Sequence, residues 1–392
     1  MTIRPRPWLM LAAAVIAQAA TTVVAATPAF LIPYFHQDNG LSLAEAGLIA
    51  GAPNLGLVLS LVAWGAATDR WGERRVLVTG LAATAAAVAL SMLAQGFGWL
   101  GVALIVSGAL SACTNAASGR LIVGWFPAHR RGLAMGIRQT CQPIGIALAS
   151  LVVPALASAD GARTALAFGG LLVAVSLIVC LVVIVDPARP PRKAAAQSAN
   201  PYRASFSLAR IHAVSVLLVV PQFALSTFGL VWFTAGFGWD PLAAGAVVAA
   251  AQLVGAAGRI AVGVWSDRLG SRLRPLRWVA LAGIVAMLAT AALGWLEWSI
   301  PAALAYLVAS CISVADNGLA FTAVAELAGP RWSGRALGVQ NTGQFLAAAI
   351  VAPAVGGLIG LVGYPFSFAL VALAPALATP LVPPPSVERV QR

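Results

Sequence analysis

The side chains with the most chemistry in this sequence are charged groups inside long apolar runs, and Arg259 is the clearest of them. It lies about 12 Å from Asp267 along a helix, at 1.5 Å per residue, which places it near the middle of an apolar layer about 30 Å thick. At helical spacing it shares a face with Gln252 and Gly255. A buried guanidinium suits a planar anion such as a carboxylate. We therefore expect Arg259 to contact an anionic substrate; a structural ion pair is the alternative.

A second arginine, Arg138, also lies inside an apolar run. It shares a helical face with Cys141, Gln142 and Gly145. We expect its helix to meet the helix of Arg259, so that both guanidinium groups approach one binding space. A contact between Arg138 and a nearby loop remains an open alternative.

Two further charges lie inside apolar runs. Arg120 is rotated by about 140° from Asn115 on a helix, so both cannot face one cavity. We interpret Arg120 as a packing or snorkelling residue. Asp316 is the only carboxylate that we place near the membrane centre. It is expected either to carry a coupling proton or to neutralise an arginine, and both roles remain open.

Neutral polar side chains form short stripes on several apolar runs. Gln18 shares a face with Thr21, and Gln222 occupies the corresponding position in the second half of the chain. In the same way, Asn317 occupies the position that corresponds to Asn115. Such groups in apolar helices face a cavity or bond neighbouring helices. We expect substrate contacts from the following side chains: Arg259, Arg138, Gln18, Asn115, Gln222, Gln252, Gln142, Gln340 and Gln344.

A charged motif occurs twice between long apolar runs, about half a chain apart. Gly65-Ala-Ala-Thr-Asp69-Arg70-Trp-Gly72-Glu73-Arg74-Arg75 returns as Gly263-Val-Trp-Ser-Asp267-Arg268-Leu-Gly270-Ser-Arg272. In each copy a glycine allows a tight reversal, and the aspartate is suited to cap a helix N-terminus. We expect a gate formed by Gly65, Asp69, Arg70, Gly72, Arg74, Arg75, Gly263, Asp267, Arg268, Gly270 and Arg272. Surface charges that only set the topology are the alternative.

The elements that position these residues are long apolar helices. Of the 392 residues, 60% are hydrophobic and only 9% are charged, which predicts a membrane protein. We expect twelve helices, near residues 8–35, 43–67, 76–96, 99–125, 133–157, 164–186, 210–236, 242–265, 276–296, 300–325, 335–360 and 364–382. The repeat divides them into a half at 1–186, a Pro-rich cytoplasmic linker at 187–209, and a half at 210–392 that ends in a short cytoplasmic tail.

The charge distribution predicts the topology. The formal net charge is +12, but most of the 24 lysine and arginine residues lie at the N-terminus, in alternate loops or in the C-terminal tail. This bias places both termini in the cytoplasm, as in a bacterial inner-membrane protein. The positive charge is thus explained by the membrane topology, and we expect no binding of nucleic acid. The four cysteines lie in apolar runs, and we interpret them as free thiols rather than metal ligands.

These features together resemble the major facilitator superfamily over nearly the whole chain. Its signature Gly-x-x-x-Asp-Arg-x-Gly-x-Arg-Arg is matched by Gly65, Asp69, Arg70, Gly72, Arg74 and Arg75. Glu73 departs from it, because the family usually has a basic residue there. The resemblance implies that Asp69 contacts the start of the eleventh helix and Asp267 the start of the fifth. It also implies that helices 1, 4, 7 and 10 line a central cavity.

The segment around Arg259 resembles the oxalate/formate and monocarboxylate branches of that superfamily. Gly258-Arg259-Ile-Ala-Val-Gly263 stands where an arginine of those branches meets the substrate carboxylate. The sequence therefore predicts a secondary transporter of a small organic anion, such as a monocarboxylate, with proton coupling left open.

The main alternative is an efflux antiporter that exchanges a drug or another solute for protons. The helix-5 glycine pattern of that group is broken here, because Ala149-Ser150 replaces its Gly-Pro pair. A receptor or scaffold is a third class, without an appended soluble domain to support it. No nucleophile–base pair or metal-ligand spacing predicts an enzyme. We expect no cofactor, and we expect a monomer in the lipid bilayer with a small-molecule substrate.

Overall fold

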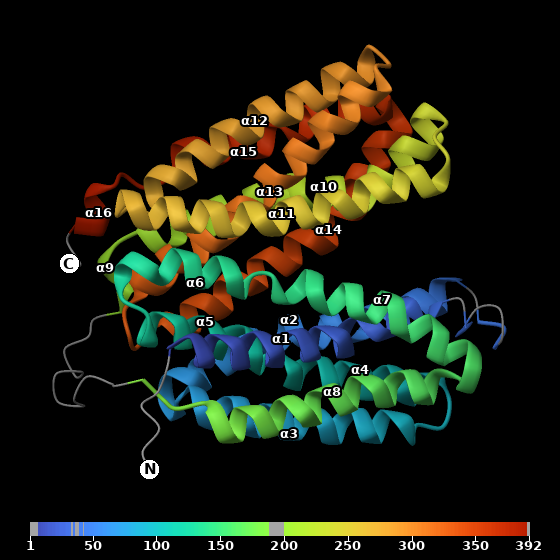
Figure 1. Cartoon of the computed structure of the whole chain (residues 1–392), viewed down its shortest axis with the longest axis vertical. Coiled ribbons are helices and arrows are strands. Elements are labelled where there is room, and N and C mark those ends of the chain that lie inside the picture. The colour runs from blue at the N-terminus through green and yellow to red at the C-terminus, as the bar shows by residue number, and fades with distance from the viewer. Residues whose placement is uncertain (1–6, 33, 36–38, 42, 188–199, 390–392) are drawn as a thin grey trace. The chain divides into compact units, whose positions relative to one another are not determined.

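The computed structural model describes every residue except 1–6, 33, 36–38, 42, 188–199 and 390–392. Within the described residues all regular secondary structure is helical (Figure 1), which confirms the predicted all-α fold. The first part of the chain forms α1 (Pro7–Phe30), α2 (Leu43–Trp71), α3 (Glu73–Met92), α4 (Phe97–Ser111), α5 (Cys113–Trp125), η2 (Ala128–Arg130), α6 (Arg131–Arg138), α7 (Cys141–Asp160) and α8 (Ala162–Val183). The second part forms α9 (Pro201–Ala204), α10 (Ser207–Val231), η3 (Trp232–Gly236), α11 (Pro241–Leu269), α12 (Leu273–Trp295), α13 (Ser299–Ala328), α14 (Ser333–Val371), α15 (Leu373–Leu381) and α16 (Ser386–Arg389).

The described helices provide twelve membrane crossings. Eleven segments are long and apolar enough to span a membrane, and the last of them, Ser333–Leu381, has 49 residues. One crossing needs only about 20 residues. Gly363 breaks this segment with φ 78° and ψ 173°, a conformation that glycine adopts readily. The segment is therefore two membrane helices, and the predicted number is confirmed.

Several predicted helices are interrupted. The helix expected at 99–125 is divided into α4 and α5 at Ala112. The helix expected at 133–157 is divided into α6 and α7 at residues 139–140. Pro143 explains the second break, because it supplies no N–H to the carbonyl four residues earlier.

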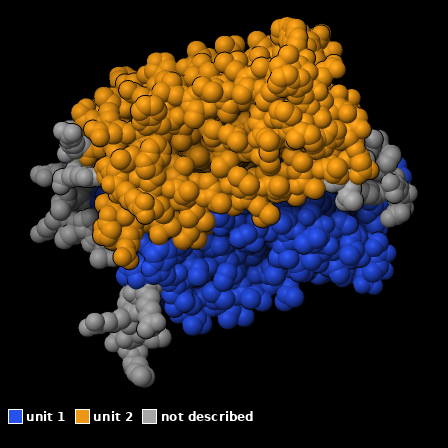
Figure 2. Space-filling model, turned by 45° about the horizontal axis from the view of Figure 1, so that its top comes forward, with its two compact units in different colours: residues 1–126, 140–198, 329–342 blue, residues 127–139, 199–328, 343–392 orange. Residues whose placement is uncertain are grey.

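Residue contacts divide the chain into two compact units, which are coloured separately in Figure 2. Unit 1 contains Met1–Phe126, Thr140–Ser198 and Gly329–Thr342, and unit 2 contains Pro127–Gln139, Ala199–Ala328 and Gly343–Arg392. The units differ from the sequence halves because the start of α6 packs with α11, and the start of α14 packs with α2. Most of the expected linker at 187–209 lies outside the described residues. The division into two sequence halves stays a prediction.

Each unit has its own apolar core. In unit 2 the core surrounds Trp232, whose ring centroid lies 4.9 Å from that of Phe368 and 5.1 Å from that of Phe233. Tyr306 of α13 packs on Phe233 and donates a hydrogen bond to the Leu225 carbonyl of α10. This packing fixes α10 against α13, which both carry predicted site residues.

Candidate functional site: two hairpin caps and an arginine cluster

In unit 1, Asp69 at the end of α2 caps the start of α14. Its two carboxylate oxygens accept hydrogen bonds from the backbone N–H groups of Gly334 (2.9 Å) and Arg335 (3.0 Å). The first N–H groups of a helix have no partner within the helix, and an anion there also interacts favourably with the helix dipole. This is the helix start that the family resemblance implied.

In unit 2, Asp267 makes the equivalent contact. Its carboxylate accepts hydrogen bonds from the backbone N–H groups of Gly132 (2.9 Å) and Leu133 (2.8 Å), in the first turn of α6. The duplicated motif therefore builds the same helix cap twice, once in each unit.

Matched glycines allow the helices to cross closely enough for these caps. A Cβ atom at Gly65 would overlap the Gly334 carbonyl, and one at Gly263 would overlap the Gly132 carbonyl. Any side chain at these positions would push the helix start away from its aspartate. The glycines of the motif thus determine whether the two carboxylates reach their partners.

Arg120 is part of the first cap, so its interpretation as a packing or snorkelling residue is wrong. Its guanidinium lies 3.2 Å from Glu73 and 3.6 Å from Asp69, and it donates to the Thr68 carbonyl at 2.7 Å. The rotation that turns Arg120 away from Asn115 directs it to the hairpin instead. Glu73, the departure from the family signature, is fully buried as its ionic partner.

The second cap obtains its cation from a different element. Arg272 of the hairpin itself lies 2.6 Å from Asp267 and donates to the Ser266 hydroxyl at 2.7 Å. Thr322 stands at the repeat position that corresponds to Arg120. The two units therefore neutralise matching aspartates with arginines from non-matching positions.

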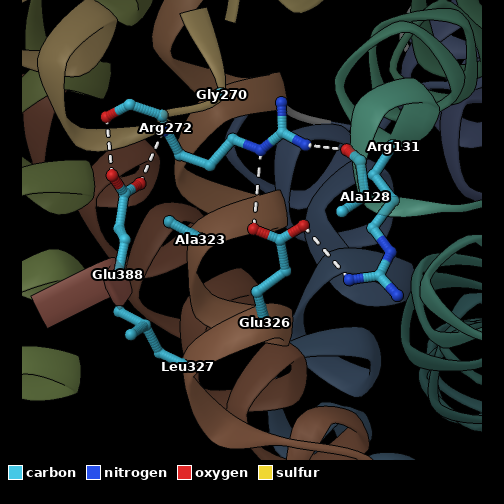
Figure 3. A pocket seen from close by; sticks show the side chains of 9 residues that line it. Ala128, Arg131, Gly270, Arg272, Ala323, Glu326, Leu327 and Glu388 are labelled. Atoms are coloured by element: carbon cyan, nitrogen blue, oxygen red, sulfur yellow. Dashed lines mark hydrogen bonds and ion pairs between the residues drawn. The ribbon is translucent and has the colours of Figure 1, made fainter. Parts of the chain in front are cut away.

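Acidic residues connect this second hairpin to its surroundings, as Figure 3 shows. Glu326 lies between Arg131 (3.2 Å) and Arg272 (3.5 Å) beside a cavity of about 110 Å³. Glu388 of α16 accepts hydrogen bonds from the backbone N–H groups of Arg272 (2.6 Å) and Leu273 (3.1 Å). The C-terminal segment thus caps α12.

Unit 1 contains a counterpart of the Glu388 cap. Asp186, just after α8, accepts a hydrogen bond from the backbone N–H of Arg74 at 2.7 Å, in the first turn of α3. The Arg74 side chain donates to the Leu181 carbonyl at 2.9 Å. The other predicted hairpin arginines, Arg70, Arg75 and Arg268, are exposed.

We expect Arg120→Met to destabilise unit 1 strongly. The substitution leaves the buried carboxylates of Asp69 and Glu73 without their cation, and breaking a buried pair in this way costs about 3–5 kcal/mol. Thermal unfolding of the purified protein tests this, with exposed Arg163→Met as the matched control. Equal melting temperatures for the two variants would contradict the assigned ion pairs.

The predicted polar stripes pair with each other inside each unit. The Gln18 amide donates to the Asn115 Oδ1 atom at 3.0 Å and accepts from the Ser118 hydroxyl at 2.8 Å. In unit 2, Asn317 donates to the Gln222 Oε1 atom at 2.9 Å. Residues that match in the repeat therefore also match in their contacts, and each pair joins two helices.

Gln344 extends the pair in unit 2. Its amide donates to the Asn317 Oδ1 atom at 2.9 Å and to the Ser215 hydroxyl at 2.8 Å. Gln340 is buried on the same helix, α14, with 1% of its surface exposed, and belongs to unit 1.

The two predicted arginines of unit 2 meet at Gln139. Arg259 donates to the Gln139 backbone carbonyl at 3.0 Å, and Arg138 donates to its Oε1 atom at 2.6 Å. Arg138 also lies over the Phe321 ring, 5.5 Å from its centroid. A Cβ atom at Gly136 would overlap the Arg259 carbonyl, so α6 crosses α11 closely here. The structure thus places both guanidinium groups in one cluster.

Two other predicted binding residues are not part of this cluster. Gln252 is exposed on α11, and Gln142 is half-buried on α7. In the described part of the chain, neither forms a hydrogen bond with Arg138 or Arg259. Their contact with substrate stays a prediction.

Asp316 is completely buried in α13. Neither carboxylate oxygen accepts a side-chain hydrogen bond from the described residues. It lines a cavity of about 10 Å³ with Leu218, Met287 and Pro375, and this is the volume of about one water molecule. Arg259 is the cation whose charge acts on it.

Some residues of these clusters were not predicted from the sequence. Gln139 was not assigned to the site, although Pro143 four positions later signals a free carbonyl. No local sequence pattern predicted a role for Glu326 or Glu388, because only the folding of the chain brings them close to Arg272.

Twelve apolar membrane crossings among the described residues, together with a duplicated charged hairpin, define a membrane transporter. A model of the Major Facilitator Superfamily matches residues 10–353, and the chain belongs to this superfamily. It is a secondary transporter of a small molecule and not an enzyme.

The chain is similar to other members over most of its length. It is 46% identical over 366 residues to an uncharacterized MFS-type transporter of Mycobacterium tuberculosis, covering 92% of this chain and 82% of that protein. It is 27% identical over 306 residues to a probable nitrate/nitrite transporter of the same species, covering 73% of this chain and 72% of the relative. The structure of a proton:xylose symporter superposes with a TM-score of 0.77 at 15% identity, covering 98% of this chain and 99% of that one. This last likeness concerns the fold alone.

Proposed function

We propose that this protein carries a small organic anion, such as a monocarboxylate, across the membrane by alternating access. The observation that carries the proposal is the Arg259 guanidinium, which is 7% exposed and lies deep within a membrane helix. The guanidinium donates to a neutral backbone carbonyl at 3.0 Å, and a carboxylate would form a stronger, charge-assisted bond in place of that carbonyl. Arg138 adds a second cation to the same cluster.

The similarity to a probable nitrate/nitrite transporter supports the class of substrate, because nitrate and nitrite are also small anions. The resemblance to the oxalate/formate and monocarboxylate branches supports a carboxylate in particular. We assign Gln222 and Asn317 to the polar surroundings of this substrate, with Gln18 and Asn115 as their counterparts in unit 1.

The two hairpin caps are the gate in this proposal. Each aspartate holds the start of a helix from the other half of the sequence. Release of both caps would free those helix starts to move during alternating access. We place the hairpins and both termini on the cytoplasmic side of a bacterial inner membrane, since their basic residues follow the positive-inside bias.

Thermal stabilisation of the purified transporter by a ligand panel tests the substrate class. The panel contains lactate, formate, nitrate, a cationic amine drug and xylose, each at several concentrations. We expect the acids to raise the melting temperature and the other two to leave it unchanged. Stabilisation by the amine and by no acid would favour an antiporter of cationic drugs and contradict the proposal.

Asp316 is our candidate for the coupling proton, because it is a buried carboxylate beside a water-sized cavity. We expect an inward proton gradient to stimulate anion uptake into proteoliposomes, and Asp316→Asn to abolish that stimulation while gradient-free exchange continues. Exposed Asp160→Asn is the control. A gradient response that persists in Asp316→Asn would exclude this role and favour a counter-ion for Arg259.

A further inference from the structure

Gln139 accepts hydrogen bonds from two arginines through its side chain and its backbone carbonyl, and Gln139 itself has no role in the transport proposal. Gln139 lies between α6 and α7 and accepts hydrogen bonds from two buried cations. Its side chain accepts from Arg138 and its backbone carbonyl from Arg259. These arginines are only 1% and 7% exposed.

Pro143 explains why this carbonyl is free to accept an arginine. In a continuous helix, the carbonyl of Gln139 would accept the N–H of the residue four positions later. That residue is Pro143, which has no N–H. The helix is interrupted at this point, and Arg259 supplies the missing donor at 3.0 Å.

The sequence repeat supplies an internal comparison. Phe345 stands at the position of Pro143, and Leu61 at the position of Arg259. The helix that contains Phe345, α14, continues without interruption through that position. One copy of the repeat therefore has both the proline that frees a backbone carbonyl and the arginine that donates to this carbonyl. The other copy has neither residue.

We propose that the Gln139 carbonyl is a resident acceptor that positions Arg259 and is displaced when the anionic substrate binds. This rests on the proposed function, because it requires Arg259 to bind an anion. The carbonyl satisfies one N–H of a buried guanidinium while no substrate is present. Being neutral, it is a weaker acceptor than a carboxylate and yields to one. Gln139 and Pro143 are thus positioning residues for Arg259.

A ligand-free double-mutant cycle tests the contact itself. Arg259→Ala leaves the Gln139 carbonyl without a donor and is expected to lower the melting temperature. Pro143→Ala restores a backbone N–H, so the same arginine substitution should lower the melting temperature by less than half as much in that background. Pro154→Ala, in the exposed part of α7, is the matched control and should give no such rescue. Additive effects for Pro143→Ala and Arg259→Ala would overturn the inference.

Anion binding tests the displacement. The probe is whichever of lactate, formate and nitrate stabilises the wild-type protein most. In Pro143→Ala the restored backbone N–H engages the Gln139 carbonyl, so Arg259 should bind this probe about threefold to tenfold more tightly, with no change in Pro154→Ala. Unchanged or weaker binding in Pro143→Ala overturns the inference and leaves the proposed function intact. If no anion binds the wild-type protein, the proposed function fails and the inference fails with it.

Discussion

Arg259→Ala is expected to lower the affinity for the transported anion about 30-fold to 1,000-fold, because it removes a buried charge that pairs with the substrate. The variant loses the charge but leaves the caps of the two hairpins in place, so it should remain folded. Titration of the purified protein with the stabilising acid, followed by calorimetry or thermal unfolding, measures the loss.

Arg274→Ala is the matched control for this result, since Arg274 is an exposed arginine in the same unit. Arg259→Lys separates charge from geometry. Lysine keeps the charge but cannot form two parallel hydrogen bonds, so we expect an intermediate affinity. An Arg259→Ala variant that binds the acid as the wild-type protein does would remove Arg259 from the binding site.

Combined Asp69→Asn and Asp267→Asn substitutions are expected to slow transport at least about tenfold. Each substitution replaces one accepting oxygen by an NH₂ group, which cannot accept from the helix N-terminus. It also removes the charge that Arg120 or Arg272 neutralises. A helix cap typically contributes about 1 kcal/mol, so losing two caps shifts the balance between gate states about 30-fold.

The exchange rate in proteoliposomes measures this effect, and the apparent affinity for the anion should change by less than about threefold, because the aspartates do not touch Arg259. Asp160→Asn serves as the control, as Asp160 is an exposed residue at the end of α7. An unchanged exchange rate in the double variant would contradict the gating role and would mean that the hairpin charges only set the topology.

Local sequence patterns were sufficient to predict the membrane helices and the capping role of the two hairpin aspartates. Apolar runs of spanning length predicted the twelve crossings, and the repeated motif predicted that Asp69 and Asp267 cap helix starts. Which helix starts they meet was implied by the family resemblance. The repeat matched Gln18 to Gln222 and Asn115 to Asn317, but it did not predict that each glutamine bonds its asparagine. Gln18 donates to Asn115 in one pair, and Asn317 donates to Gln222 in the other. A duplicated sequence preserves such contacts because both halves fold by the same packing.

Other features depend on distances that no local pattern encodes. The rotation of Arg120 excluded it from the cavity but did not show that it faces Glu73. The interruption at Gln139 could have been inferred from Pro143, but its acceptor role depends on the close crossing of α6 and α11. Glu388 reaches Arg272 only because the chain returns to α12 after its last membrane helix.

The most direct test of the central claim is counterflow of labelled lactate in proteoliposomes loaded with unlabelled lactate. We predict that the wild-type protein accumulates the label transiently and that an excess of external formate or nitrate suppresses this accumulation. Arg259→Ala should show no accumulation, while Arg274→Ala behaves as the wild-type protein does. Counterflow that is equal in Arg259→Ala and in the wild-type protein would contradict an anion site built on Arg259.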